Sequence, residues 1–130
     1  MGLDQYAYLA REEDLNDEIV DLQDFIQDKI TDLGFDYWRK FYALQEYMFA
    51  MYCLRGGEST SFNCVYMKFL SEDLYFLEEE AKKAMLLQIG YFANDSDGLD
   101  TYSGESLLEF IPKARLAMEQ GNAVIYDSWW

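Results

Sequence analysis

The stretch from Glu12 to Leu33 carries the most regular pattern of hydrophobic and polar positions in the chain. Apolar side chains recur along it at steps of three and four, the spacing of one face of an α-helix: Leu15, Ile19, Leu22, Ile26, Ile30 and Leu33. A row of acids follows at nearly the same steps, one position earlier: Asp14, Asp17, Asp21, Asp24, Asp28 and Asp32. The pattern therefore predicts an acidic amphipathic helix near the N-terminus, with the acids beside its apolar seam.

The acid row has two interpretations. A run of like charges is usually a solvated outer face. However, like charges three or four residues apart on a helix repel each other by up to ~0.5 kcal/mol per pair, and Lys29 is the one base in this stretch. The helix predicted from Ser71 is different, because Glu78 and Glu79 stand four residues before Lys82 and Lys83, which is the stabilising order. The unbalanced row therefore indicates a surface that binds a partner.

The rest of the chain predicts one α+β domain over residues 1–130, with a small, mostly antiparallel sheet and several helices on one face. Alternation and runs of β-branched and aromatic residues predict strands near residues 2–9, 62–70, 88–92 and 122–129, the second of them interior. Helices are predicted over Tyr37–Leu54 with Asp36 as N-cap, from Ser71, and from Ser106 to Gly121 with an interruption at Pro112. The aromatic helix Tyr37–Leu54 is expected in the core, with partner contact as the alternative.

Charge narrows the classes of partner. The chain has 25 acids and 10 bases, which gives a net charge of −15. Such a domain is repelled by nucleic acids and by anionic membranes, and it is attracted to basic surfaces, including those that hold DNA or RNA. Solubility alone would also account for an acidic composition. No apolar run reaches the ~18 residues of a membrane span, so no membrane contact is predicted.

The sequence predicts no catalytic, cofactor or metal site. It contains no histidine, and Cys53 and Cys64 are expected to be free, buried thiols. The Asn94–Asp100 turn partly matches a calcium loop, but Ala93 and Gly104 stand where that loop needs acids. The chain is therefore expected not to be an enzyme.

Four stretches resemble a small protein family common in bacteriophage genomes: MGLDQYA, WRKFYALQEYM, FNCVYMKFLSEDL and LLEFIPKARLAMEQGNAVIYDSWW. They fall within residues 1–10 and 36–130, whereas Glu12–Leu33 agrees least with the family. Members are sometimes labelled phosphoglycerate kinases, although no kinase motif is visible in this chain. The resemblance implies a phage origin and a setting in the host cytoplasm, and it implies no catalytic residues.

These observations lead to a function hypothesis: an acidic phage protein that inhibits a host nucleic-acid-binding protein, of the anti-CRISPR or another anti-defence type. The acid row would occupy a basic groove as a nucleic-acid mimic. The expected partner is this host protein, with no direct binding of nucleic acid or membrane. The alternative is a structural or self-assembling phage protein, in which the apolar seam of the acidic helix pairs with its symmetry mate in a homodimer.

Overall fold

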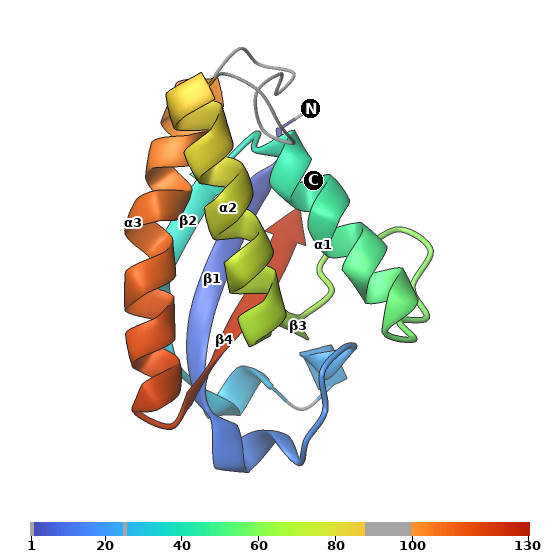
Figure 1. The fold of residues 1–130 in the computed structure, drawn as a ribbon. Helices are drawn as coiled ribbons and strands as arrows, with labels where there is room; N and C mark the ends of the chain where they lie inside the picture. The colour runs from blue at the N-terminus through green and yellow to red at the C-terminus, as the bar shows by residue number, and fades with distance from the viewer. Residues whose placement is uncertain (1, 25, 88–99) are drawn as a thin grey trace.

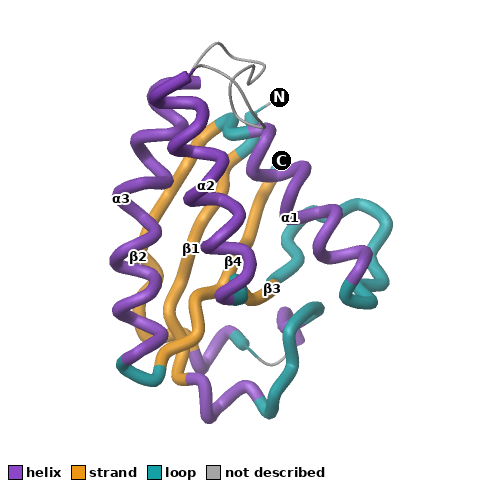
Figure 2. The backbone as a smooth tube through the Cα atoms, viewed as in Figure 1, coloured by secondary structure: helices purple, strands orange, loops and turns teal. Residues whose placement is uncertain are grey.

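The computed structural model describes residues 2–24, 26–87 and 100–130, which form an antiparallel sheet with helices on one face (Figure 1, Figure 2). The strands are β1 (Asp4–Arg11), β2 (Ile30–Arg39), β3 (Met67–Lys68) and β4 (Asn122–Trp129), in the order β2-β1-β4-β3 across the sheet. The helices are α1 (Tyr42–Leu54), α2 (Ser71–Leu87) and α3 (Asp100–Glu119). The predicted α+β class is therefore confirmed.

The two central strands, β1 and β4, run side by side over their whole length. Their register pairs Asp4 with Trp129 and continues without a shift to the pair Arg11 and Asn122. This ladder satisfies backbone N–H and C=O groups of segments from opposite ends of the chain. The strands predicted near residues 2–9 and 122–129 are confirmed.

Three helices pack on one side of this central ribbon: in Figure 1, α2 and α3 lie in front of the sheet and α1 lies to the right of β4. Ala7 of β1 and Val124 and Tyr126 of β4 belong to the core on this side. The helices contribute buried apolar side chains to the same core: Leu44 and Met48 of α1, Leu74, Leu77 and Ala81 of α2, and Phe110, Ile111 and Ala114 of α3. Burying each of the larger side chains stabilises the fold by roughly 1.5–3 kcal/mol.

Part of the opposite face is covered by the segment that joins β1 to β2 (residues 12–29), at the bottom of Figure 1. Leu15, Leu22 and Ile26 are fully buried there. They pack against the second face of the sheet, which presents Tyr8, Ala10, Ala123 and Ile125. The helix predicted over Glu12–Leu33 is wrong: the segment forms three short 3-10 turns, and β2 begins at its end. The turns are η1 (Glu12–Leu15), η2 (Leu22–Asp24) and η3 (Gln27–Lys29).

The backbone explains why no helix forms in this segment. Asn16, Asp17 and Asp21 adopt left-handed φ angles of 52°, 64° and 57°. Such a conformation interrupts a right-handed helix, and Asn and Asp adopt it more readily than other side chains. Asp and Asn are also poor helix formers, because their side chains compete for the backbone hydrogen bonds. The apolar spacing therefore reflects contacts with the sheet and not a continuous helix.

Residues 37–54, predicted as one helix with Asp36 as N-cap, divide between two elements. Residues 37–39 complete β2, Lys40 adopts a left-handed φ of 57°, and α1 begins only at Tyr42. Asp36 forms an ion pair with Lys113 at 3.3 Å instead of capping a helix. This pair connects β2 to α3.

The strand predicted over residues 62–70 is confirmed only at Met67–Lys68, and its predicted interior position is wrong. Met67 and Lys68 form the two residues of β3, which pair with β4 at the edge of the sheet. The Cys64 and Phe69 amides also donate to the Ser128 and Val124 carbonyls of β4, at 2.7 and 2.8 Å. Left-handed φ angles at Phe62 (48°) and Cys64 (60°) interrupt the extended backbone before β3.

Helix α3 passes through Pro112 without the predicted interruption. A proline inside a helix removes a hydrogen bond and crowds the preceding turn, which costs ~3 kcal/mol. The helix continues because Leu107 and Phe110, on the turn before the proline, are fully buried in the core. The strand predicted at residues 88–92 and most of the Asn94–Asp100 turn lie outside the described residues.

A buried ion pair joins α1 to α2. Asp73 is fully buried and accepts hydrogen bonds from Arg55 at 2.6 and 2.9 Å, from the Tyr47 hydroxyl at 2.7 Å and from the Leu70 amide at 2.8 Å. These donors replace the water that a carboxylate loses on burial. Burial, followed by the hydrogen bond to Asp73, raises the pKa of Tyr47, so its hydroxyl remains a donor.

The arrangement of the β1–β2 segment predicts different effects for two leucines from the same sequence pattern. Leu22→Ala removes a fully buried side chain and should lower the free energy of unfolding by about 2–5 kcal/mol. Leu33→Ala truncates a side chain that is 68% exposed on β2, so it should change stability by less than ~0.5 kcal/mol. Chemical denaturation measures both, and equal effects would contradict the observed packing.

Candidate functional site

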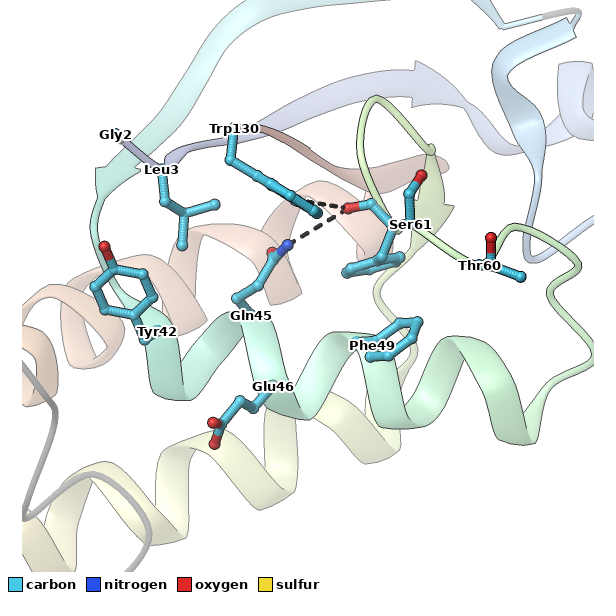
Figure 3. A pocket seen from close by; sticks show the side chains of 10 residues that line it. Gly2, Leu3, Tyr42, Gln45, Glu46, Phe49, Thr60, Ser61 and Trp130 are labelled. Carbon is cyan, nitrogen blue, oxygen red and sulfur yellow. Dashed lines mark hydrogen bonds between the residues drawn. The ribbon is translucent and has the colours of Figure 1, made fainter.

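A pocket of about 500 Å³ opens where the two ends of the chain come together (Figure 3). One wall is the face of α1 that carries Tyr42, Gln45 and Phe49, side chains three or four residues apart on the helix. The other walls come from Gly2 and Leu3, from the loop residues Thr60, Ser61 and Phe62, and from Trp130. The pocket therefore depends on segments that are far apart in the sequence.

A network of buried amides and hydroxyls lies behind the pocket. Gln5 of β1 donates to the Phe41 carbonyl and accepts from the Phe41 amide, both at 2.8 Å, and it also donates to the Tyr126 hydroxyl at 3.0 Å. Tyr126 donates to the amide oxygen of Gln45, and Gln45 donates to Ser128 at 3.0 Å. The network fixes α1 against β1 and β4 and holds Gln45 in one orientation.

The Phe62 carbonyl completes the polar groups of the pocket wall. It accepts hydrogen bonds from the Trp130 indole at 3.2 Å and from Gln45 at 3.5 Å, the two dashed lines in Figure 3. Because these polar atoms bond within the protein, the pocket offers a ligand mainly aromatic and aliphatic surface. The exposed polar side chains that line it are Glu46, Thr60 and Ser61.

The ionisable and hydroxyl-bearing side chains of the pocket are few. Its described lining residues include Glu46, Thr60, Ser61 and Tyr42, and no His, Cys or Lys. Within the described ranges, no three His, Cys, Asp or Glu side chains come together as metal ligands. None of the helices in those ranges is long and apolar enough to span a membrane.

The loop that lines the pocket is attached to the acidic β1–β2 segment. Asp21 of that segment accepts hydrogen bonds from the Tyr52 hydroxyl of α1 and from the Glu58 amide, the latter at 3.1 Å. The Tyr52 hydroxyl also accepts from the Ser59 amide at 2.7 Å. Gly57 allows this contact, because a Cβ there would lie 2.3 Å from atoms of the Tyr52 ring. The pocket and the acidic segment therefore adjoin.

The six acids predicted to bind a partner do not form one row. Asp17, Asp28 and Asp32 are exposed, Asp14 is partly buried, Asp21 is engaged by Tyr52 and Glu58, and Asp24 lies in η2 with its side chain outside the description. Asp32 stands on β2 and accepts a hydrogen bond from the Gly34 amide at 2.9 Å. The structure therefore brings these acids onto one segment of the chain but not onto one helix face.

The basic side chains are largely occupied by acids. Among the described side chains, ion pairs of 4.0 Å or less involve seven bases: Arg11, Arg55, Lys68, Lys82, Lys83, Lys113 and Arg115. Because the chain has 25 acids and 10 bases, at least 15 acids have no base of their own to balance them. In this part of the chain, the exposed acids without an ion pair to a described base are Asp17, Glu18 and Asp28 on the β1–β2 segment and Asp32 at the start of β2. Neighbouring charges of one sign within a Debye length of ~8–10 Å reinforce each other's potential.

Sequence patterns did not reveal the pocket. Gln45, which with Glu46 interrupts a largely apolar helix, and the terminal Trp130 were the available signals, but neither shows which distant segment it meets. Cys53 and Cys64 are free as predicted, but both are exposed and not buried.

Compared with known proteins, the chain matches no family model, no curated protein and no solved structure. The resemblance to a phage family therefore stays a prediction from the quoted motifs.

The close approach of Gly57 to Tyr52 can be tested by adding one methyl group. Gly57→Ala should push the Tyr52 ring from its place, weaken its bond to Asp21 and lower the free energy of unfolding by about 1–3 kcal/mol. Gly34→Ala is the matched control, because its nearest neighbouring atom would lie at 3.8 Å. Thermal unfolding compares the two variants, and unchanged stability of Gly57→Ala would contradict the described contact.

Proposed function

We propose that this protein is a non-enzymatic, phage-encoded inhibitor that binds a nucleic-acid-binding protein of the host, of the anti-CRISPR or another anti-defence type. The observation that carries the proposal is the net charge of −15, with exposed acids beyond the ion pairs on the β1–β2 segment. Such a surface is attracted to the Lys/Arg groove that normally holds phosphates. The phage origin and the host-cytoplasm setting rest on the family resemblance alone.

The proposed mechanism is competition for the basic groove. Asp17, Glu18, Asp28 and Asp32 present carboxylates where nucleic-acid phosphates would otherwise bind. These acids lie on turns and on the start of β2, so they do not repeat at a fixed spacing. The mimicry therefore depends on the summed potential of the segment and not on a phosphate-like repeat. Binding of this kind weakens steeply as salt rises.

The adjoining pocket supplies contact area that charge alone does not. Interfaces gain much of their affinity from a few large side chains that fill preformed pockets. The aromatic lining of this pocket suits one apolar side chain of the partner, and Glu46 at its edge suits a neighbouring cation. Because Asp21 ties the acidic segment to the pocket loop, one partner surface can contact both.

The self-assembly alternative loses the surface on which it was based. Leu15, Leu22 and Ile26 of the apolar seam are fully buried within the chain. They therefore cannot pair with a second copy while the chain stays folded. Leu33, at the end of the same seam, is exposed on β2, but a single leucine offers little area for pairing.

Charge neutralisation at the acidic segment tests the proposed function. The partner is first isolated from bacterial lysate on immobilised protein at low salt, and its nucleic-acid binding is then measured with and without this protein. Competition is expected, and it should weaken by at least about tenfold for the combined change Asp17→Asn, Glu18→Gln and Asp28→Asn. Asn at position 17 also suits the left-handed backbone there.

The matched control removes the same number of charges elsewhere. Glu105→Gln, Glu109→Gln and Glu119→Gln alter exposed acids of α3 and should leave competition within about twofold of the unaltered protein. Equal losses in the two variants would show that only total charge matters. Simultaneous binding of nucleic acid and this protein to the partner would contradict the competitive mechanism.

A further inference from the structure

A buried carboxylate lies among tyrosines on the second face of the sheet, outside the pocket. Asp127 of β4 is 7% exposed and stands opposite Tyr6 in the β1–β4 register. Tyr8, two residues further along β1, donates its hydroxyl to Oδ2 of Asp127 at 3.0 Å. Tyr66 immediately precedes β3, and the β3–β4 register continued by one residue places it beside Asp127.

One oxygen of this carboxylate has no partner. Oδ1 of Asp127 is buried and accepts no hydrogen bond from any described residue. A buried polar atom without a donor costs free energy, so few remain in a folded protein. No ion pair among the described residues includes Asp127. Burial raises its pKa to about 6, although the Tyr8 hydroxyl and the nearby Ser128 amide favour the ionised form.

Aromatic rings surround this carboxylate. The Tyr6 and Tyr8 rings stack with centroids 5.9 Å apart, and the Tyr8 and Tyr66 centroids are also 5.9 Å apart. The pKa of each of these tyrosines is raised, first by burial and then by neighbouring charges that include Asp127. The sheet face ends in Tyr37 and Trp129, whose side chains are 51% and 60% exposed. The faces of aromatic rings attract cations.

We propose that Asp127 and its surrounding tyrosines receive one lysine or arginine side chain of the basic partner. The cationic head donates a hydrogen bond to Oδ1 of Asp127, and the aliphatic stem lies against the Tyr6 and Tyr66 rings. A cation is the ligand that supplies the missing donor, neutralises the buried charge and is attracted to the rings. This inference rests on the proposed function, which provides a basic partner.

The acidic segment is continuous with this site. The Leu22 amide donates to the Tyr66 carbonyl at 3.0 Å, and the Tyr66 amide donates to the side-chain oxygen of Gln23 at 3.3 Å. Turn η2 therefore lies next to Tyr66. Its acidic neighbours attract a basic surface to the side of the molecule on which Asp127 and its tyrosines lie.

Binding should strengthen as pH rises from about 5 to about 7, because only the ionised carboxylate attracts the cation strongly. The other titratable groups around Asp127 are the hydroxyls of Tyr6, Tyr8 and Tyr66 and the thiol of Cys64. Their pKa values are all raised, Cys64 first by burial, so these groups stay neutral over this range. A bound cation in turn lowers the pKa of Asp127.

Nuclear magnetic resonance of the Asp127 carboxyl carbon tests the site directly. Its titration midpoint is followed with Nα-acetyl-lysine amide, with Nα-acetyl-arginine amide and with the neutral, Nε-acetylated lysine derivative. Both cationic probes, or one of them, should lower the midpoint and shift the Tyr6 and Tyr66 ring signals, and the neutral probe should do neither. Asp127→Asn should abolish the ring shifts, whereas Asp4→Asn, an acid bonded to Tyr37 on the same sheet, should retain them. An unchanged midpoint with both cationic probes overturns the proposal.

Binding of an octalysine peptide separates this inference from the proposed function. Asp127→Asn should bind the peptide at least about tenfold more weakly than the unaltered protein. Salt-sensitive binding that stays within about twofold in Asp127→Asn overturns the inference and leaves the proposed function standing. A lowered Asp127 midpoint without any binding of basic peptide or protein supports the site and contradicts the proposed function. Tyr66→Leu, which removes one ring and keeps the carboxylate, provides the same comparison if Asp127→Asn does not fold.

Discussion

The central β1–β4 ribbon has apolar and aromatic side chains on both faces, and the rest of the chain is arranged to cover them. Ala7, Val124 and Tyr126 lie under the three helices, while Tyr8 and Ile125 lie under the irregular segment between β1 and β2. Exposed apolar surface in water is unfavourable at roughly 25 cal/mol per Å², so each face requires a cover. The second cover is incomplete, and the sheet face beyond it ends in the exposed rings of Tyr37 and Trp129.

The β1–β2 segment has two roles: its apolar side chains cover the sheet, and its exposed acids form the charged surface. Leu15, Leu22 and Ile26 anchor it to the sheet, Asp17, Glu18 and Asp28 are exposed, and Asp21 joins it to the pocket loop. Because packing against the sheet stabilises the segment, it does not need charge pairs along a helix to keep its conformation. An unbalanced set of acids is therefore tolerated here, and it provides the surface on which the proposed binding function depends.

Particular residues show how much of this could be predicted from the sequence. The alternation in β1, the apolar run of β4 and the acids after Ser71 in α2 are local signals, and these elements were predicted correctly. The steps of three and four from Leu15 to Leu33 were misleading, because turns that pack on a sheet can present the same spacing; Asn16 and the many aspartates were the contrary signal. The acidity of the chain, on which the proposed binding surface rests, was visible in the composition. The pocket around Gln45 and the surroundings of Asp127 were not, because each unites residues more than sixty positions apart.

The most direct test of this account is a set of nuclear Overhauser measurements between methyl and aromatic protons, together with backbone chemical shifts for residues 12–33. The account predicts contacts from Leu22 and Ile26 to Ile125 and the Tyr8 ring, with no continuous run of helical shifts and with extended shifts from Ile30 onward. A continuous helix over residues 12–33 without contacts to the second face of the sheet would contradict it. That result would also restore a single row of acids and change the surface on which both proposals are built.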